Sequence, residues 1–207
     1  MKNKIYIIGA GGHGQVVLDT LLQSGLSPVG FLDDNVPVGE KILDIPVIGK
    51  ISLAKNLDGQ FIVAIGDNTM RKRIVGMLQF SDEKYFSVIH PSVILSKNVK
   101  IGVGSMIIGG VVINIGTVIG KHTIINTSVS IDHHNIIGDF VHIAPGVHTG
   151  GNVIVKDGAF VGLGCSVISG KEIGKWAVVG AGAAVISNVP DHSVSVGVPA
   201  KVIKGQV

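Results

Sequence analysis

Cysteine and aromatic residues are scarce in this sequence of 207 residues. It contains one cysteine, Cys165, and aromatic residues make up 4% of it. A single cysteine excludes an intrachain disulfide framework and any zinc site built on cysteines. No window of about 18 uncharged apolar residues is present, so we expect no membrane span. The first six residues lead directly into an apolar strand without a signal-peptide pattern, so we expect a cytoplasmic protein.

Neither sign of charge dominates the sequence. It has 17 Lys and Arg against 14 Asp and Glu, a formal net charge of +3. The charges are scattered, with no basic stripe or aromatic platform for nucleic acid, and the small positive excess is compatible with phosphorylated ligands. Glycine is abundant instead: the 30 glycines are about twice the ordinary usage. They show no G-X-Y period, which excludes collagen, and 46% hydrophobic residues are enough for a buried core.

Residues 1–86 alternate short apolar runs with helical patterns. This alternation predicts a parallel sheet with helices packed on it. A further short helix is expected after Ser52. The predicted strands are Ile5–Ile8, Val29–Leu32, Val47–Ile48 and Phe61–Ile65, and the predicted helices are Gln15–Leu22 and Thr69–Phe80.

From Ile89 onward the sequence has a period of six. Every sixth residue up to Val185 is a branched aliphatic in sixteen of seventeen cases, and Thr149 is the exception. Neither a helix nor a simple strand has this period, whereas a β-helix built from hexapeptides does. Each triangular coil then consists of three successive hexapeptides. A second inward position follows four residues after each aliphatic, and we expect Asn135 and Lys171 to fit it poorly, with local distortion at Lys171.

The hexapeptide repeat resembles that of the left-handed β-helix acyltransferases, and the segment Gly197–Lys201 is similar to the motif that closes their helices. With its N-terminal α/β part, nearly the whole chain resembles the bacterial sugar acetyltransferases of the sialic-acid O-acetyltransferase and nucleotide-4-amino-sugar N-acetyltransferase type. The fold expected from this resemblance is a Rossmann-like α/β half-domain (1–86) followed by a left-handed parallel β-helix of hexapeptide repeats (87–207). The resemblance also implies a homotrimer with active sites between subunits. We expect outward apolar residues such as Ile108 to form its interfaces.

Residues 9–14 read Gly-Ala-Gly-Gly-His-Gly between the first strand and the first helix. This satisfies the dinucleotide fingerprint, with Asp33 about twenty residues beyond it. A region of 86 residues is only about half of a full dinucleotide fold, however, and the resemblance implies a nucleoside diphosphate-sugar instead. In that interpretation the glycine loop faces the diphosphate or sugar, a carboxylate after the next strand contacts the nucleoside, and the loop 64–68 with Arg71 lines the pocket. The substrate-binding residues implied are Gly11, Gly12, His13, Asp33, Asp34, Gly66 and Asn68.

Four of the eight histidines fall within sixteen residues, at His133, His134, His142 and His148. His133 and His142 do not occupy inward positions of the repeat, so core packing does not explain them. Acetyl transfer to an amine requires a base, because the amine loses a proton as it attacks the thioester, and histidine is the usual base near neutral pH.

The segment 131–142 resembles the catalytic segment of the sugar acetyltransferases. His133 falls on the general base, His142 on a second histidine near the thioester, and Asn126 on a residue near the acceptor. Relatives often carry an acidic residue directly after the base, where this chain has His134. Asp132 or Asp139 could orient His133 in its place, or the base could act without a carboxylate. We take His133, His142 and Asp132 as the catalytic candidates.

The resemblance implies that acetyl-CoA, the acetyl donor, lies along a groove between adjacent β-helices. His142, Gly151, Leu163 and Ala181 fall on positions that line it, and Lys201 or Lys204 could meet its phosphates. Zinc-dependent β-helix enzymes of the γ-carbonic-anhydrase type use two histidines five residues apart. Such a gap is missing from this cluster, so we expect no metal.

The leading hypothesis is an acetyl-CoA-dependent N-acetyltransferase that acts on a nucleotide-linked amino sugar in surface glycan synthesis. An O-acetyltransferase of sialic acid or a related sugar is the first alternative. A noncatalytic nucleotide-binding assembly module is the second alternative.

Overall fold

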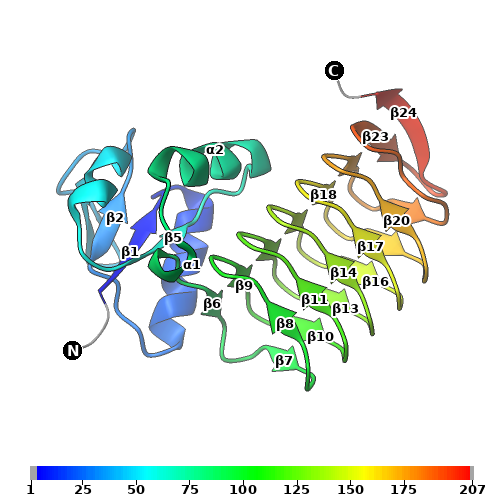
Figure 1. Ribbon diagram of the computed structural model, residues 1–207, viewed down its shortest axis with the longest axis horizontal. Coiled ribbons are helices and arrows are strands. Elements are labelled where there is room, and N and C mark those ends of the chain that lie inside the picture. Colours follow the sequence, from blue (N-terminus) through cyan, green and yellow to red (C-terminus); the bar gives the residue numbers. More distant parts are fainter. Residues whose placement is uncertain (1–3, 206–207) are drawn as a thin grey trace.

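The computed structural model describes residues 4–205, in two parts that lie side by side (Figure 1). The first three residues, which belong to the segment without a signal-peptide pattern, lie outside this range. The N-terminal part is a sheet with helices, and the C-terminal part is a stack of coils that extends away from it. Within the described range, we find no helix long and apolar enough to cross a membrane.

A five-stranded sheet in the order β3-β4-β2-β1-β5 forms the N-terminal part. Four of its strands are parallel, as the alternation of strands and helices predicts. The predicted strands and both predicted helices are present, and the short helix near Ser52 is a 3-10 helix. The elements are β1 (Ile5–Ile8), α1 (Gly12–Gln23), β2 (Gly30–Leu32), β3 (Lys41–Ile42), β4 (Ile45–Gly49), η1 (Ile51–Asn56), β5 (Gln60–Val63), α2 (Asn68–Leu78) and η2 (Asp82–Lys84).

Strand β3, which pairs with β4 as an antiparallel hairpin, was not predicted from the sequence. The two turn residues, Leu43 and Asp44, both have positive φ, 46° and 66°. Hairpin turns of two residues need this conformation and usually take it at Asn-Gly or Asp-Gly. Because the turn reads Leu-Asp, the sequence does not indicate a hairpin here.

The C-terminal part is a parallel β-helix with three sheets, each made of strands two residues long. Strands that are three hexapeptides apart in the chain pair in register, as Ile124 with His142 and Ile125 with Ile143, so the predicted coil length is confirmed. The long sheet has the order β24-β23-β21-β18-β15-β12-β9-β6, and the other two are β22-β19-β16-β13-β10-β7 and β20-β17-β14-β11-β8. The strands are β6 (Val88–Ile89), β7 (Ile94–Leu95), β8 (Lys100–Ile101), β9 (Met106–Ile107), β10 (Val112–Ile113), β11 (Val118–Ile119), β12 (Ile124–Ile125), β13 (Ser130–Ile131), β14 (Ile136–Ile137), β15 (His142–Ile143), β16 (His148–Thr149), β17 (Ile154–Val155), β18 (Phe160–Val161), β19 (Ser166–Val167), β20 (Glu172–Ile173), β21 (Val178–Val179), β22 (Ala184–Val185), β23 (Ser193–Val196) and the antiparallel β24 (Lys201–Gly205).

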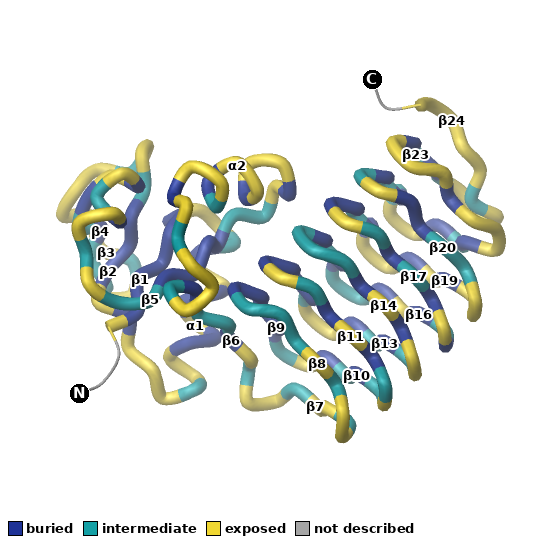
Figure 2. Tube along the Cα trace, in the orientation of Figure 1, coloured by how far each residue is buried: buried dark blue, intermediate teal, exposed yellow. Residues whose placement is uncertain are grey.

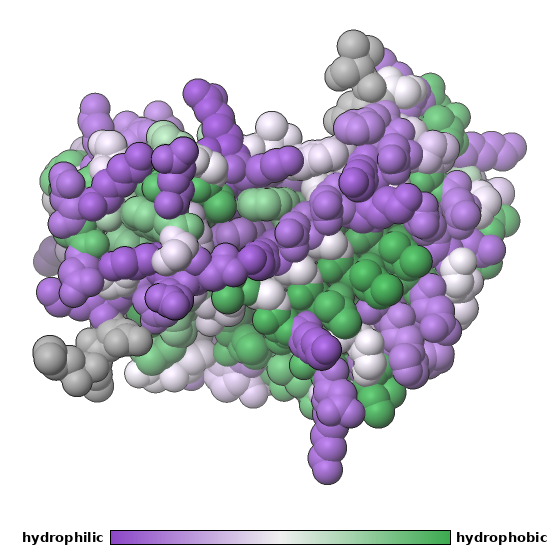
Figure 3. Space-filling view, viewed as in Figure 1, coloured by the Kyte–Doolittle hydropathy of each residue, from purple (hydrophilic) through white to green (hydrophobic). Residues whose placement is uncertain are grey.

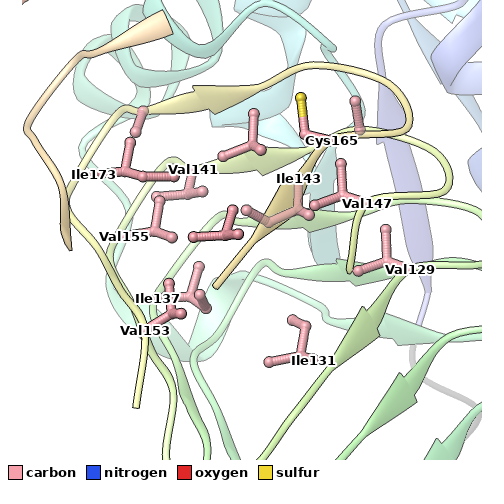
Figure 4. Packing of buried hydrophobic residues seen from close by; sticks show 14 of the residues in the cluster. Val129, Ile131, Ile137, Val141, Ile143, Val147, Val153, Val155, Cys165 and Ile173 are labelled. Carbon is pink, nitrogen blue, oxygen red and sulfur yellow. The ribbon is translucent and has the colours of Figure 1, made fainter. Parts of the chain in front are cut away.

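The inward side chains of the three sheets meet in one continuous core. Figure 2 shows burial alternating along every coil, and Figure 4 shows residues such as Ile131, Ile143 and Val155 pointing into the coil interior. Branched aliphatics fit here because each coil is thin and its layers stack directly on one another. At the open end of the β-helix the inward side chains are less completely buried, and Ile89 and Leu95 remain 38% and 39% exposed.

The two poorly fitting inward positions behave differently from each other. Asn135 is fully buried, and its amide donates to the carbonyls of Asp132 and Gly150, so it braces the turn between β13 and β14. The distortion predicted at Lys171 is wrong. The amide of Ile154 donates to the Lys171 carbonyl, and β20 pairs in register with β17.

The α/β part covers the outward face of the long sheet near its first coils. Met106, Ile108 and Ile124 share one apolar cluster with α1 and the central sheet. Ile108 is only 4% exposed. Our expectation that Ile108 faces a neighbouring subunit is therefore wrong, because the chain's own N-terminal part occupies that surface.

Candidate active site

The glycine loop between β1 and α1 contains two kinds of glycine. Gly9 has φ +102°, and a Cβ on it would collide with Ile65; a Cβ on Gly14 would collide with the backbone of Gly9. These two glycines are required by packing. Gly11 and Gly12 are exposed with open space around them, and no side chain caps the start of α1. The first amides of α1 are therefore accessible to a phosphate group.

Both carboxylate oxygens of Asp33 accept hydrogen bonds from backbone amides. One carboxylate oxygen accepts the amide of Ala10 at 2.8 Å, and the other accepts those of Asn35 and Val36 at 2.8 and 3.1 Å. Burial raises the pKa of Asp33, but these three donors outweigh it and hold that pKa below its usual value. The carboxylate thus fixes the loop after β2, and contact between Asp33 and a nucleoside stays a prediction.

Asp34 remains available for a ligand. It is exposed and uses one oxygen to accept the amide of Ile51 at 3.0 Å. It opens on a cleft of about 340 Å³ in the α/β part, with apolar walls and one arginine. The lining residues are Asp33, Asp34, Asn35, Ile51, Ile65, Met70, Arg73, Ile74 and Met77.

Arg71 joins the two parts of the molecule and does not line a pocket. Its side chain is fully buried. Nε donates to the carbonyl of His122 at 2.7 Å, and Nη2 donates to the carbonyl of Phe140 at 2.9 Å, both on the β-helix. Nη1 donates to the carbonyl of Ile65 at 2.7 Å, and Nη2 also donates to Asn68 Oδ1 at 2.8 Å. Burial lowers the pKa of Arg71 to about 9, which leaves it protonated at neutral pH.

Asn68 is a second fastener between the parts. It is 8% exposed, and its amide donates to the carbonyls of Gly158 and Ala159 at 3.1 and 3.0 Å. Its oxygen accepts from Arg71, so both ends of the amide are occupied. We had expected Asn68 to bind substrate, and the structure instead uses it to fix the start of α2 on the β-helix.

His142 lies on β15 with both ring nitrogens engaged. Nδ1 is 3.0 Å from the carbonyl of Gly66, which can only accept, so Nδ1 carries the hydrogen. Nε2 is 3.1 Å from the amide nitrogen of Asn126, whose oxygen accepts the amide of Thr127. Burial lowers the pKa of His142 to about 4, against the opposing effect of the Gly66 carbonyl. His142 is therefore a neutral, fixed imidazole at physiological pH and a weak base.

His13, in the first turn of α1, faces His142 from the α/β part. Their ring centroids are 6.1 Å apart. Burial lowers the pKa of His13 to about 3, with a smaller contribution from His142. Within the described residues, the buried Nε2 of His13 has no hydrogen-bond partner. The structure thus brings together Gly66, His13, Asn126 and His142 from four separate segments.

A pocket of about 430 Å³ opens beside this group, between the start of α2 and the outward face of the long sheet. Trp176 forms one wall, with its indole over Gly158 and the ammonium of Lys72 at 5.0 Å from the ring centroid. The lining residues are Gly66, Asp67, Asn68, Thr69, His142, Gly158, Phe160, Trp176 and Val178.

His133 lies away from this pocket in the same chain. It follows β13 and precedes β14, so it is on the edge between the two shorter sheets, opposite the long sheet that carries His142. Its ring is exposed and lies over Gly151 of the next coil, where a Cβ would collide with it. The clustering of His133 with His142 that the sequence suggested does not occur within one chain.

Asp132 supports the backbone beside His133. Its Oδ1 accepts the amide of His133 at 2.8 Å and the side-chain amide of Asn114 at 3.0 Å. These bonds hold the pKa of Asp132 below its usual value. Asp139 accepts the amide of Lys121 on another edge. Neither carboxylate hydrogen-bonds the His133 ring in the part of the chain that the structure describes.

The expected acetyl-CoA positions fall on two edges. Gly151 is on the His133 edge, whereas Leu163 and Ala181 are exposed in consecutive coils between the long sheet and the sheet of β19 and β22. Lys201 and Lys204 are exposed on β24 at the far end. No single edge of the described chain therefore carries all of these positions.

Comparison with known proteins decides the family. The PglD N-terminal domain model matches residues 4–78. A histidine-to-alanine mutant of GDP-perosamine N-acetyltransferase from Caulobacter crescentus, solved with CoA and GDP-perosamine, has 34% sequence identity and a TM-score of 0.91, covering 99% of this chain and 98% of that one. The chain belongs to the nucleotide-amino-sugar N-acetyltransferases.

Two further relatives agree with this assignment. The acetyltransferase domain of PglB from Neisseria gonorrhoeae, solved with acetyl coenzyme A, has 32% identity and a TM-score of 0.91, covering 98% of this chain and all of that domain. UDP-N-acetylbacillosamine N-acetyltransferase from Bacillus subtilis is 38% identical over 112 residues, 52% of this chain and 51% of that protein. The match thus spans about half the length of that curated relative. Across residues 4–205, no group of three or more His, Cys, Asp or Glu side chains could hold a metal in this N-acetyltransferase.

The aromatic wall of the pocket beside His142 was not predicted from the sequence. Phe160 pairs with His142 across β18 and β15 and therefore occupies the same outward position one coil further on. Its ring meets the His142 ring edge-on at 5.2 Å. The hexapeptide count contains this signal, since the outward neighbours of a candidate histidine lie three hexapeptides away in either direction along the chain.

Proposed function

We propose that the protein transfers the acetyl group of acetyl-CoA to the amino group of a nucleotide-linked amino sugar. The observation that carries the proposal is the preformed pocket between the Gly66–Thr69 segment and His142, in a chain that resembles GDP-perosamine N-acetyltransferase over its whole length. The two parts of the molecule have different roles in this proposal. The α/β part holds the nucleotide, and the β-helix carries the chemistry.

The nucleotide portion fits the α/β part. The exposed amides at Gly11 and Gly12 suit the diphosphate, because the start of a helix attracts anions. The cleft beside Asp34 has apolar walls for a nucleobase and a free carboxylate edge for its N–H groups. The centroid of the His13 ring lies 6.1 Å from that of His142, next to the pocket proposed for the sugar.

The chemistry needs a base that the fixed, neutral His142 does not supply. In the proposed reaction the amine nitrogen attacks the acetyl carbon, His133 takes the amine proton, and the carbon–sulfur bond breaks. The thiolate of CoA then receives a proton, which leaves an amide and free CoA. Backbone amides stabilise the tetrahedral oxyanion.

This division of residues requires a neighbouring subunit, and a homotrimer with intersubunit sites meets that need. The His133 edge of one copy then faces the His142 pocket of the next. The surface for such packing is present: Val118 and Ile136, outward on β11 and β14, are 39% and 52% exposed, and Figure 3 shows an apolar patch over these strands. Light scattering tests this, with an expected mass of three times the 21.4 kDa chain. A fully active monomer would refute it.

The test of the activity is a panel of UDP-, dTDP- and GDP-linked 4-amino sugars, assayed with acetyl-CoA for thiol release. Turnover of at least one amino sugar, with a new amide in the product, supports the proposal. Turnover of sialic acid or another hydroxyl acceptor alone favours the O-acetyltransferase. Nucleotide binding without thiol release on any acceptor favours an assembly module. A cytoplasmic location, where acetyl-CoA and nucleotide sugars are made available, is part of the proposal.

A further inference from the structure

The ring of His133 has one hydrogen-bond partner among the described residues, and it is the next residue. Nδ1 of His133 lies 3.1 Å from Nδ1 of His134. The ring centroids are 5.3 Å apart with planes at 76°. Two neutral imidazoles that meet through these nitrogens share one hydrogen, so one ring donates and the other accepts.

The backbone holds His134 in the left-handed conformation, as it does His122 at the equivalent turn of an earlier hexapeptide. The φ of His134 is +56°, and its amide donates to the carbonyl of Ile115 at 2.9 Å. The corresponding positions in other coils are Asn98, Gly116, Asn152 and Gly170, with φ of 68°, 75°, 56° and 70°. Asparagine is one of the residue types that accept this left-handed conformation most readily.

The ring of His134 also needs space that the repeat provides. It lies over Gly116, where a Cβ would be 2.6 Å from its Cδ2 atom. The side chain is exposed and adds nothing to the core, so neither packing nor backbone preference accounts for a histidine here. The contact with His133 is what distinguishes it from the asparagines at the same corner.

We infer that His134 is a positioning residue that accepts the Nδ1 hydrogen of His133 and so keeps the Nε2 lone pair of His133 free. This rests on the proposed function, in which His133 is the base. The hydrogen bond on one imidazole nitrogen decides which form the other nitrogen takes. Asp132 and Asp139 do not take this role, because Asp132 accepts the His133 backbone amide and the Asn114 side-chain amide and Asp139 accepts the Lys121 amide.

The proton movements in this arrangement balance. As the amine attacks the acetyl carbon, its proton goes to Nε2 of His133, which becomes an imidazolium. Nδ1 of His133 keeps its hydrogen bonded to His134 throughout. The imidazolium then returns the Nε2 proton to the departing CoA sulfur, so both histidines end as they began.

The decisive experiment replaces His134 with asparagine, the residue at two of the equivalent corners. The change His134→Asn keeps a side chain suited to positive φ but removes the ring that reaches His133. We expect kcat on the true substrate to fall roughly tenfold to hundredfold, the range for partners that orient a functional histidine. KM for both substrates and the melting temperature should hardly change. The variant His134→Gln, whose longer neutral side chain brings an acceptor back toward His133, should recover part of the loss.

The matched control is His192→Asn. His192 also has positive φ, +54°, and is exposed at the last coil. This change should leave kcat and melting temperature at their wild-type values. In a His133→Ala background, His134→Asn should have no further effect, because the group it positions is gone.

A readout without any variant of His134 is the nitrogen NMR spectrum of the histidine rings. We expect His133 in the Nδ1–H form and His134 with an unprotonated Nδ1, assigned by the signals lost in His133→Ala. An unprotonated Nδ1 on His133, unchanged kcat in His134→Asn, or an additive loss in the His133→Ala background would each overturn the inference. Full activity of His133→Ala, or no amino-sugar turnover by the wild type, would instead refute the proposed function.

Discussion

Loss of the Arg71 guanidinium should separate the two parts of the molecule. Arg71 binds carbonyls of the loop after β5 and of two β-helix coils at the same time. In Arg71→Met the hydrocarbon portion of the side chain remains but these bonds are lost. The change therefore tests the fastening role of the guanidinium rather than the filling of space.

The size of the effect follows from the acceptors left behind. Besides Arg71, no described residue donates to the carbonyls of Ile65, His122 and Phe140. A buried polar group without a partner costs about 1–3 kcal/mol. Entry of water and relief from burying a charge reduce the sum. We therefore expect a net loss of roughly 3–5 kcal/mol in the free energy of unfolding, about 10 °C or more in the melting temperature.

Calorimetry and urea unfolding measure this loss. We expect the single transition of the wild type to split, with the α/β part melting first. The change Arg71→Lys should lie between the wild type and Arg71→Met, because one ammonium cannot reach both sides of the junction. The control is Arg73→Met on the same helix, where the side chain is exposed and the expected change is below about 0.5 kcal/mol. If Arg71→Met stays within about 1 kcal/mol of the wild type, the guanidinium does not fasten the two parts.

Three further predictions concern activity and acid stability. The change His133→Ala should lower kcat by roughly 10²–10⁴-fold, with KM for the sugar nucleotide nearly unchanged; wild-type kcat in this variant would exclude His133 as the base. Co-expression of His133→Ala with His142→Ala chains at equal levels should restore about one quarter of the wild-type activity. The reason is that a site shared between two chains is intact only when one chain supplies an unaltered His133 and the other an unaltered His142. Mixed trimers as inactive as the single variants would place both residues in one chain's site. Burial holds the pKa values of His13, His122 and His142 at about 3, 4 and 4, below 6.5 in the unfolded chain, so the unfolded state binds more protons below pH 6.5. Stability should be complete above about pH 7.5 and fall by about 1 kcal/mol per histidine between pH 7.5 and 5.5. His122→Phe should remove about a third of this dependence in urea unfolding; an unchanged slope would show that His122 does not titrate with folding.

The residue one coil after His122 shows that phenylalanine fits this position of the repeat. His122 has φ +53°, and Phe140 occupies the same corner one coil later with φ +56° and stacks on it at 5.2 Å. A phenylalanine is therefore already accepted by this backbone. The buried Nδ1 of His122, which lacks a partner among the described residues, disappears in the variant.

Much of the fold could be predicted from the sequence because its signals are local. The six-residue period fixes which side chains point inward, since a thin coil accepts only a few shapes at each inward position. The strand and helix alternation of the first part follows from the same kind of local pattern. The hairpin with its turn at Leu43 and Asp44 was not predicted, because this turn lacks the Asn-Gly or Asp-Gly pair that usually marks one.

The candidate site could be predicted only in part. The period also determines which face each residue occupies, so counting hexads separates His133 from His142 on the sequence alone. No local pattern in the sequence predicts the contacts that Arg71, Asn68 and Ile108 make. They depend on where the α/β part rests on the long sheet, a contact between segments far apart in the chain.

The sequence by itself determined the β-helix, its coil length and the presence of histidines on its outer surface, because repetition in the chain becomes repetition in space. The tertiary structure decided which polar residues remain available for a ligand. Asp33, Asn68 and Arg71 are polar in the sequence and resemble binding residues, but Asp33 accepts backbone amides within the α/β part, and docking of the two parts gives Asn68 and Arg71 backbone partners on the β-helix. Whether a polar group binds substrate or holds the fold depends on the hydrogen bonds left free after packing, and only the assembled structure fixes these.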